Sequence, residues 1–315
     1  MRFAVGNAQD IGARPEQEDS FGFSDPRNQT FVAHGGLLGV VADGMGGLSH
    51  GSEASRSAVR TFLGTYELKS AGESIPEALK RSLLEANRAV LALAAKSNSP
   101  HGVGTTLAAV VLHQNSLYWI SAGDSRIYLL HGDRLTQITA DHVYAKELNQ
   151  KVAAGRLSRA EAQNDSERDA VTSYLGKRDL AEIDCNRRPF PLLPGERVIL
   201  CSDGFYHALS EKEITAAFSG KMQAACEDLV RQAVAKHREH QDNLTVIGLM
   251  SEVDSAVQSR KNGGRLSRVL GWGLLVLILL LLVFGAGFLC GTRYGPIRAL
   301  EQRTLGSTQG AGRAK

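Results

Sequence analysis

One stretch of the chain, Val40-Val41-Ala42-Asp43-Gly44-Met45-Gly46-Gly47, limits the possible folds more than any other. An apolar, partly β-branched run that stops at Asp-Gly predicts a buried strand that presents the Asp43 carboxylate at the edge of a sheet. The glycines that follow let the backbone approach whatever Asp43 binds. A pyrophosphate is one candidate, but the Lys-Ser/Thr of a P-loop and the G-x-G-x-x-G spacing are both absent. A hard cation is the better interpretation.

Similar acidic strand ends recur along the chain. They stand at Glu18-Asp19, Gly123-Asp124, Ser202-Asp203 and Asp242-Asn243, and most adjoin a hydrophobic run. Several strands that end in carboxylates can converge on one site made of oxygen ligands. Oxygen ligands without paired Cys or His favour Mg²⁺ or Mn²⁺ over zinc or copper.

The composition indicates a globular domain and excludes several classes of function. The chain has 315 residues, of which 43% are hydrophobic and 22% charged, with a formal net charge of +3. Part of that charge flanks a C-terminal apolar segment, so we expect no nucleic-acid partner. The four cysteines form no C-x-x-C pair, which argues against a zinc or redox motif. The first residues lack an apolar signal segment, so we expect the domain to be cytosolic.

Hydrophobic periodicity predicts an alternation of strands and helices. The expected strands are 3–7, 19–23, 30–34, 37–42, 105–112, 116–121, 126–130, 183–186, 197–202 and 242–249. The expected helices are 52–68, 75–97 and 223–237, with a further one that begins after Ser210, where Glu213 completes a capping box.

Two polar segments each allow two interpretations. The segment from Arg14 to Asp19 places a guanidinium just before two carboxylates, which fits an anion held beside a metal, or else a solvated charge cluster in a surface turn. Residues 141–176 are rich in both charges and helical in propensity. They predict either a flap that helps to select substrates or a solvated pair of surface helices.

The C-terminal part differs from the rest. Residues 251–268 are polar and basic and indicate a linker. Residues 269–292 contain no charge, and this apolar segment is long enough to form one transmembrane helix. Basic residues lie on both sides of this span, so they do not fix its orientation. Because no export signal precedes the domain, we expect a single-pass protein of the inner (cytoplasmic) membrane. Its residues 1–250 would be in the cytosol and its polar tail, 293–315, outside.

The ordered series of motifs resembles the metal-dependent serine/threonine protein phosphatases of type 2C, in particular the bacterial branch. The resemblance covers about residues 2–250. The matching elements are Arg14 with Glu18-Asp19, Asp43 to Gly47 followed by Gly51 and Ala54-Ser55, Gly104-Thr105-Thr106, Gly123 to Arg126, Thr139 with Asp141-His142, Thr172 to Gly176, Ser202-Asp203-Gly204 and Asp242-Asn243.

The resemblance implies an α+β fold, a four-layer α-β-β-α sandwich of two mostly antiparallel sheets. It also implies two Mn²⁺ or Mg²⁺ ions at the sheet edge. Asp43 would bridge both ions, the Gly44 carbonyl would bind one, and Asp203 and Asp242 the other. Glu18 and Asp19 would bind directly or through water, and Asp124 with Asp203 would hold a third ion. Arg14 would hold the phosphate of the substrate.

The chain departs from the family pattern in two places. Bacterial members commonly have His after the Gly-Gly and an acidic residue four positions later, where this chain has Leu48 and Ser52. Eukaryotic members have a His directly after the Asp-Gly, proposed as general acid, where this chain has Met45. The group that protonates the leaving oxygen is therefore unassigned.

The favoured function is hydrolysis of phosphoserine and phosphothreonine in proteins, in opposition to a bacterial Ser/Thr kinase at the membrane, by a tethered monomer. One alternative is a catalytically weak regulator that binds phosphoproteins. Loss of Asp43, Asp203 or Asp242 would have favoured it, and all three are present. A hydrolase of small phosphoesters or nucleotides is a third possibility that the same two-metal chemistry permits.

Overall fold

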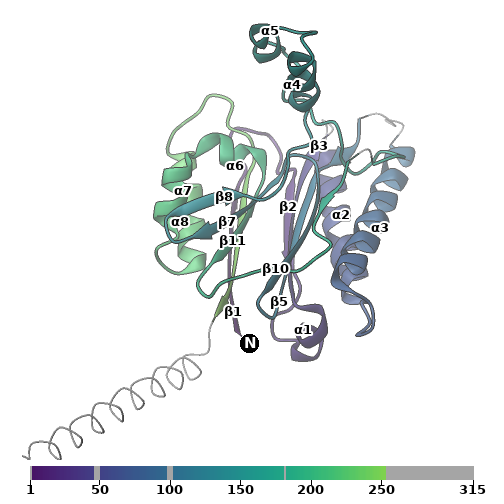
Figure 1. Ribbon diagram of the computed structural model, residues 1–315, viewed down its shortest axis with the longest axis vertical. Helices are drawn as coiled ribbons and strands as arrows, with labels where there is room; N and C mark the ends of the chain where they lie inside the picture. The colour runs from purple at the N-terminus through teal and green to yellow at the C-terminus, as the bar shows by residue number, and fades with distance from the viewer. Residues whose placement is uncertain (1, 46–49, 98–101, 181, 253–315) are drawn as a thin grey trace, which may run out of the picture. The chain divides into compact units, whose positions relative to one another are not determined.

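The computed structural model describes residues 2–45, 50–97, 102–180 and 182–252 (Figure 1). The chain divides into two units, residues 1–254 and 255–315, and the described residues all belong to the first. The predicted transmembrane helix and tail lie outside the described residues, as does the predicted linker apart from its first two residues, which prolong the last strand. Among the helices of the described part, none is both long and apolar enough to cross a membrane.

The described strands form two antiparallel sheets. The first sheet has the order β1 (Arg2–Asp10), β12 (Leu244–Glu252), β11 (Arg197–Cys201), β7 (Arg126–His131) and β8 (Arg134–Gln137). The second has the order β10 (Phe190–Pro191), β6 (Ser116–Ala122), β5 (Leu107–His113), β3 (Leu37–Met45) and β2 (Asp19–Phe23), with β4 (Gly104–Thr105) on β3 and β9 (Asp184–Cys185) on β6.

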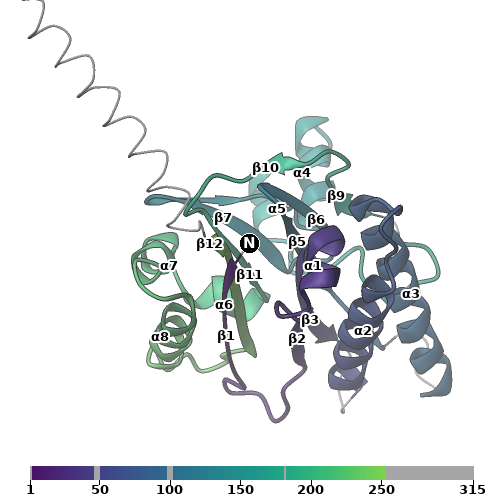
Figure 2. The ribbon, with the colours of Figure 1, turned by 90° about the horizontal axis from the view of Figure 1, so that it is seen from below.

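Helices cover the outer face of each sheet, as the view in Figure 2 shows. The second sheet is covered by α2 (His50–Glu67) and α3 (Ile75–Lys96), and α1 (Gln29–Gly35) lies at its end. The first sheet is covered by α6 (Asp203–Ala208), α7 (Glu211–Ala217) and α8 (Met222–Val234). Two further helices, α4 (Ala145–Ala153) and α5 (Arg159–Gln163), project from the sandwich in Figure 1. The predicted four-layer arrangement is thus confirmed for the described residues.

Strand β3 explains why the sandwich needs apolar residues on both faces of its sheets. Leu38 and Val40 point into the core beneath α2 and α3, whereas Leu37 and Val41 point into the core between the sheets. A strand buried on both sides is apolar throughout, because its side chains alternate between two dry interfaces. At Gly39 an added Cβ would lie 3.0 Å from Leu249 of the other sheet.

One predicted strand is wrong. Residues 30–34 form part of helix α1, because the Asn28 side chain caps its first turn by accepting a hydrogen bond from the Phe31 amide at 3.1 Å. Phe31 then packs edge-on against Tyr66 of α2. The prediction also missed α6, β8 and β10, which are short. The helix after Ser210 is confirmed, with the expected capping box to Glu213.

Candidate active site

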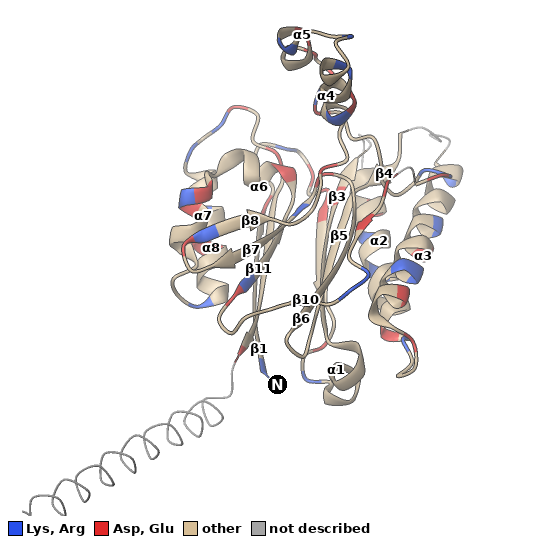
Figure 3. Cartoon of the chain, in the orientation of Figure 1, with Lys and Arg blue, Asp and Glu red and all other residues tan. Residues whose placement is uncertain are grey.

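Strand register brings the predicted acidic residues to one edge of the sandwich. Asp19 lies directly opposite Asp43 in the antiparallel pair of β2 and β3. Asp203 directly follows Ser202 at the end of β11, and Asp242 precedes β12. The antiparallel strands β11 and β12 are joined at this end by a 3.1 Å hydrogen bond from the Ser202 amide to the Thr245 carbonyl. In Figure 3 acidic residues (red) gather at this edge, near β3 and α6.

A cavity of about 280 Å³ lies at this edge. All the predicted site residues except Asp19 line it, namely Arg14, Glu18, Asp43, Gly44, Asp124, Asp203 and Asp242. Met45, Thr106, Val171 and Asn243 complete the lining. Residues distant in sequence therefore meet at one place, as the sequence predicted.

Asp19 lies behind the cavity and is only 4% exposed. The Ser202 hydroxyl donates a 2.6 Å hydrogen bond to its Oδ2. Its Oδ1 is buried and has no hydrogen-bond partner among the described residues. A carboxylate oxygen in that position is an unused acceptor, which suits a cation or a water bound to one.

Arg14 contacts the site through a carboxylate. Its Nη2 lies 2.5 Å from Oδ2 of Asp242, and about half of the Arg14 side chain is exposed. The structure shows no other hydrogen bond from this guanidinium to a described residue, so Nε and Nη1 are free of protein partners there. Arg14 therefore reaches the rim of the cavity, as predicted, and the contact it makes is with a predicted metal ligand.

Two residues to which the sequence assigned no role build the site. The Asn243 amide accepts a hydrogen bond from the Glu18 amide at 2.7 Å and donates to the carbonyls of Ile11 and Glu16 at 2.9 and 3.1 Å. It thereby ties the loop before β2 to the start of β12. The Thr106 hydroxyl accepts from the Asp43 amide at 3.0 Å. The sequence shows both residues next to acidic motifs, but it does not reveal these bonds.

Gly44 is required by close packing. A Cβ on Gly44 would lie 2.2 Å from the carbonyl oxygen of Gly51 at the start of α2 and 2.7 Å from the carbonyl oxygen of Glu18. No side chain fits there, so the backbone after Asp43 passes directly between the β1–β2 connection and α2. The sequence interpretation was that glycine lets the backbone approach what Asp43 binds, and the structure shows that the protein's own packing at Gly44 also requires it.

The clustered carboxylates raise one another's pKa values. Burial, followed by repulsion from Asp19 and Asp203, holds the pKa of Asp43 well above its usual range. Burial raises the pKa of Asp19 to about 7 against the hydrogen bond from Ser202, and burial with repulsion from Asp203 raises the pKa of Asp124 to about 7. Such a cluster is stabilised by cations, which favour the ionised form.

The donor set fits hard divalent cations. The site offers carboxylate oxygens, the Gly44 carbonyl and no sulfur, which is the chemistry that Mg²⁺ and Mn²⁺ prefer. Within the described part of the chain, no three acidic, His or Cys side chains stand close enough together to hold an ion by themselves. Backbone oxygen and water would complete the coordination, as is usual for Mg²⁺.

Residues 141–176 are anchored beside Asp124. The His142 Nδ1 accepts a 3.1 Å hydrogen bond from the Gly123 amide, and the Gly123 carbonyl accepts one from the His142 amide at 3.0 Å. Arg126 binds both oxygens of Asp141 and stacks 3.5 Å from the Tyr206 ring centroid. The segment that follows His142 forms α4 and α5, which project from the sandwich in Figure 1, and Val171 near its end lines the acidic cavity.

The two departures from the family pattern differ in their position. Met45 lines the cavity, and no described residue of its lining is a histidine. Ser52 is buried in α2, and Leu48 lies outside the described residues. Outside the lining, the Nδ1 of His207 lies 4.0 Å from Oδ2 of Asp203.

Comparison with known proteins then decides the family. The sequence pattern of protein phosphatase 2C matches residues 17–244. The chain belongs to the protein phosphatase 2C family. A serine/threonine phosphatase named stp from Listeria monocytogenes is 31% identical over 238 residues, which cover 74% of this chain and 90% of that protein.

Solved structures of bacterial serine/threonine phosphatases agree. The Mycobacterium tuberculosis serine/threonine phosphatase PstP is 27% identical with a TM-score of 0.66, and the match covers 80% of this chain and all of that one. A second structure, the catalytic domain of PstP in complex with two manganese ions, is 26% identical with a TM-score of 0.63 and covers 80% and 99% of the two chains. These solved chains are matched over nearly their whole length by 80% of this chain, in which residues 1–254 form a compact unit of their own.

Proposed function

We propose that this protein phosphatase 2C member hydrolyses phosphoserine and phosphothreonine in proteins with two Mn²⁺ or Mg²⁺ ions at the cavity between the sheets. The convergence of Asp43, Asp203 and Asp242 on one cavity supports this most directly. The manganese ions of the related PstP domain support the choice of metal. Asp124 with Asp203 would hold a third ion.

In this proposal each group of the site has a separate task. Asp43, the Gly44 carbonyl, Asp203 and Asp242 would hold the two ions, with Glu18 and Asp19 binding directly or through water. When bound, the ions supply the charge that neutralises a phosphate dianion and lowers the pKa of the attacking water. Asn243 and Thr106 fix the backbone on both sides of the site through the bonds described above.

Arg14 would orient the phosphate. A guanidinium is permanently charged, and its forked donors match two phosphate oxygens. Arg14 stands at the exposed rim, with two of its three nitrogens free of described protein partners. Its bond to Asp242 keeps the side chain at the cavity, where the incoming substrate would compete for it. No Ser or Cys nucleophile is required by this scheme.

Turnover by residues 1–254 tests the proposal. We expect phosphate release from a phosphothreonine peptide with Mn²⁺ or Mg²⁺ and none with a chelator. We also expect kcat/KM for the peptide to exceed that for a nucleotide by at least about tenfold. Faster hydrolysis of the nucleotide would point to a small-molecule hydrolase. No turnover from a folded, metal-binding domain would favour the phosphoprotein-binding regulator.

We further propose that residues 269–292 tether the enzyme to the inner membrane as a monomer, with the phosphatase domain in the cytosol, where it opposes a Ser/Thr kinase. The 24 residues carry no charge and include an almost uninterrupted Leu-rich run. Extraction of membranes with alkaline carbonate should leave the full chain in the pellet and release residues 1–254. Release of both would remove the tether from the account.

A further inference from the structure

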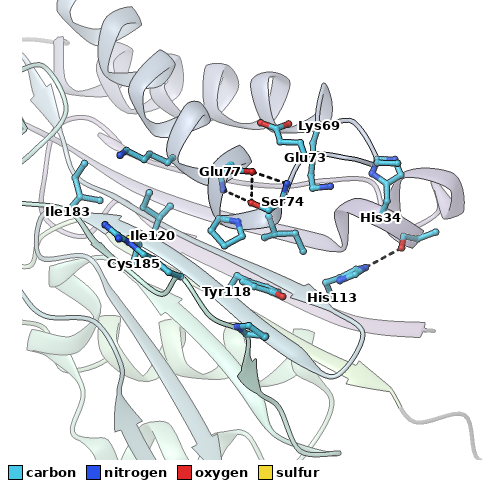
Figure 4. A pocket seen from close by; sticks show the side chains of 17 residues that line it. His34, Lys69, Glu73, Ser74, Glu77, His113, Tyr118, Ile120, Ile183 and Cys185 are labelled. Atoms are coloured by element: carbon cyan, nitrogen blue, oxygen red, sulfur yellow. Dashed lines mark hydrogen bonds between the residues drawn. The ribbon is translucent and has the colours of Figure 1, made fainter.

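A second cavity, larger than the acidic one, lies elsewhere in the domain. It has a volume of about 980 Å³ and lies between the start of α3, the end of α1 and the β5–β6 hairpin (Figure 4). His113 at this cavity follows Leu112, which pairs with Leu37 at the start of β3. Asp43 is six residues further along β3, so the two cavities are roughly 20 Å apart at about 3.3 Å per residue. The protein phosphatase chemistry makes no use of the larger one.

The charges that line this cavity are mainly positive. Lys69, Lys80 and Arg187 line it, and none of the three forms a salt bridge with a described residue. The two acidic residues of the lining, Glu73 and Glu77, already have partners. Glu73 is held by Arg81 through bonds of 2.8 and 2.9 Å, and Glu77 accepts from the Ser74 hydroxyl at 2.7 Å in a capping box. The cavity therefore has an excess of unpaired cationic groups.

Lys69 is the most unusual of these groups because it is only 4% exposed. Its ammonium donates one hydrogen bond, at 3.0 Å to the Ser70 carbonyl, although it has three N–H groups. Burial lowers the Lys69 pKa, and Glu73, already bound to Arg81, is the charge that opposes this effect. A buried ammonium without an ionic partner is costly, and an anion in the cavity would supply that partner.

A second polar group in the cavity also lacks a partner. The Nδ1 of His34 is buried and forms no hydrogen bond with a described residue. Figure 4 shows His34, Lys69 and Tyr118 around the same space, with Ile120 and Ile183 on its wall. These apolar side chains suit a ring or a hydrocarbon body. The volume is that of a site for a single small ligand.

We infer that this cavity binds a small organic anion with an apolar body, whose charged group contacts Lys69 and whose body packs against Tyr118, Ile120 and Ile183. The anionic group would be a carboxylate, sulfonate or phosphate. Arg187 and Lys80 at the exposed rim attract the anion, and His34 offers a further polar contact. This site is separate from the phosphatase centre and does not rest on the proposed catalytic function.

Naphthalene-1-sulfonate is a suitable probe, because it has both parts and cannot be hydrolysed by a phosphatase. Its dissociation constant for residues 1–254 is measured by calorimetry, next to those of naphthalene-1-methanol and inorganic sulfate. Cys185 supplies a second readout, because it lines the cavity and is the exposed cysteine of the domain, whereas Cys201 and Cys226 are buried. A bound probe should slow its alkylation by N-ethylmaleimide several-fold.

We expect the sulfonate to bind at least about tenfold more tightly than either the alcohol or sulfate. Lys69→Met, which keeps the volume of the side chain, should weaken binding at least about tenfold, the effect of losing one charge-assisted hydrogen bond. Lys96→Met, at the other end of α3, should change it less than twofold. Arg187→Gln provides a second variant at an exposed position, with an expected loss of about threefold, should Lys69→Met fail to fold.

Three results would overturn the inference. The first is equal binding of the alcohol and the sulfonate. The second is unchanged binding of the sulfonate in Lys69→Met or, if that variant does not fold, in Arg187→Gln. The third is alkylation of Cys185 at the same rate with and without saturating sulfonate. A cooperative urea transition and a wild-type circular dichroism spectrum show that the Lys69→Met variant is folded.

Discussion

Asp124→Asn should stabilise the metal-free phosphatase domain and do so only at neutral and higher pH. Asp124 is 8% exposed, and burial together with the nearby Asp203 raises its pKa from an ordinary 3.8 to about 7. The pKa of Asp124 in the folded state thus lies roughly three units above that in the unfolded chain. At about 1.4 kcal/mol per unit, ionisation of Asp124 destabilises the folded state by at most about 4 kcal/mol. The amide has the same shape and carries no charge, so it removes this penalty.

The sign of the pH dependence follows from proton binding. Between pH 4 and pH 7 the folded domain keeps the Asp124 proton that the unfolded chain has already lost. The contribution of Asp124 to stability therefore falls as pH rises through this window, and the full penalty is present above pH 7. Urea denaturation of residues 1–254 with chelator measures this. At pH 8 the variant should be more stable than wild type by about 2 to 4 kcal/mol, and at pH 4.5 by less than about 1 kcal/mol.

The control is Asp133→Asn, because Asp133 is exposed in the turn between β7 and β8. It should change stability by less than about 0.5 kcal/mol at either pH. An Asp124→Asn variant that is less stable than wild type at pH 8 without metal would contradict the electrostatic reasoning. So would an equal gain at both pH values, since a gain that is independent of pH cannot come from ionisation.

Three other changes test single features of the site. Asn243→Ala leaves the Glu18 amide and two carbonyls without partners and should lower the unfolding free energy by about 2 to 4 kcal/mol, measured by urea denaturation. A loss below about 1 kcal/mol would show that the loop is held by other means. Gly44→Ala places a Cβ against Gly51 and should abolish turnover and lower the melting temperature. Wild-type turnover and melting temperature in this variant would show that the backbone there can move. Arg14→Ala should lower kcat/KM by roughly 10- to 100-fold, with Arg14→Lys restoring only part of it, and full activity of the alanine variant would exclude a role in phosphate binding.

The site could be predicted from sequence to the extent that it depends on strand ends. Asp43 and Asp203 each follow an apolar run, so their place at a sheet edge was predictable from local pattern. The register that sets Asp19 opposite Asp43 was not, because it depends on pairing between strands. Asp19 was expected among the ligands, and the structure buries it behind the cavity with a bond to Ser202.

The errors in the fold have a common physical cause. Residues 30–34 are β-branched or aromatic in part, which suggested a strand, but the Asn28 cap and the contact of Phe31 with Tyr66 fix a helix. Tertiary packing overrides propensity in so short a segment. The three hydrogen bonds of Asn243 and the close approach of Gly44 and Gly51 likewise join segments far apart in sequence, which no local pattern reveals.

The most direct test of the account is phosphate release from a phosphothreonine peptide by residues 1–254 with saturating Mn²⁺, compared between wild type, Asp203→Asn and Asp133→Asn. Asp203 lies in the acidic cavity, and Asp133 is an exposed carboxylate outside it. We expect Asp203→Asn to lose more than about 100-fold in turnover and Asp133→Asn to keep the wild-type rate. Wild-type turnover in a folded Asp203→Asn domain would contradict the assignment of this cavity as the metal-dependent phosphatase centre.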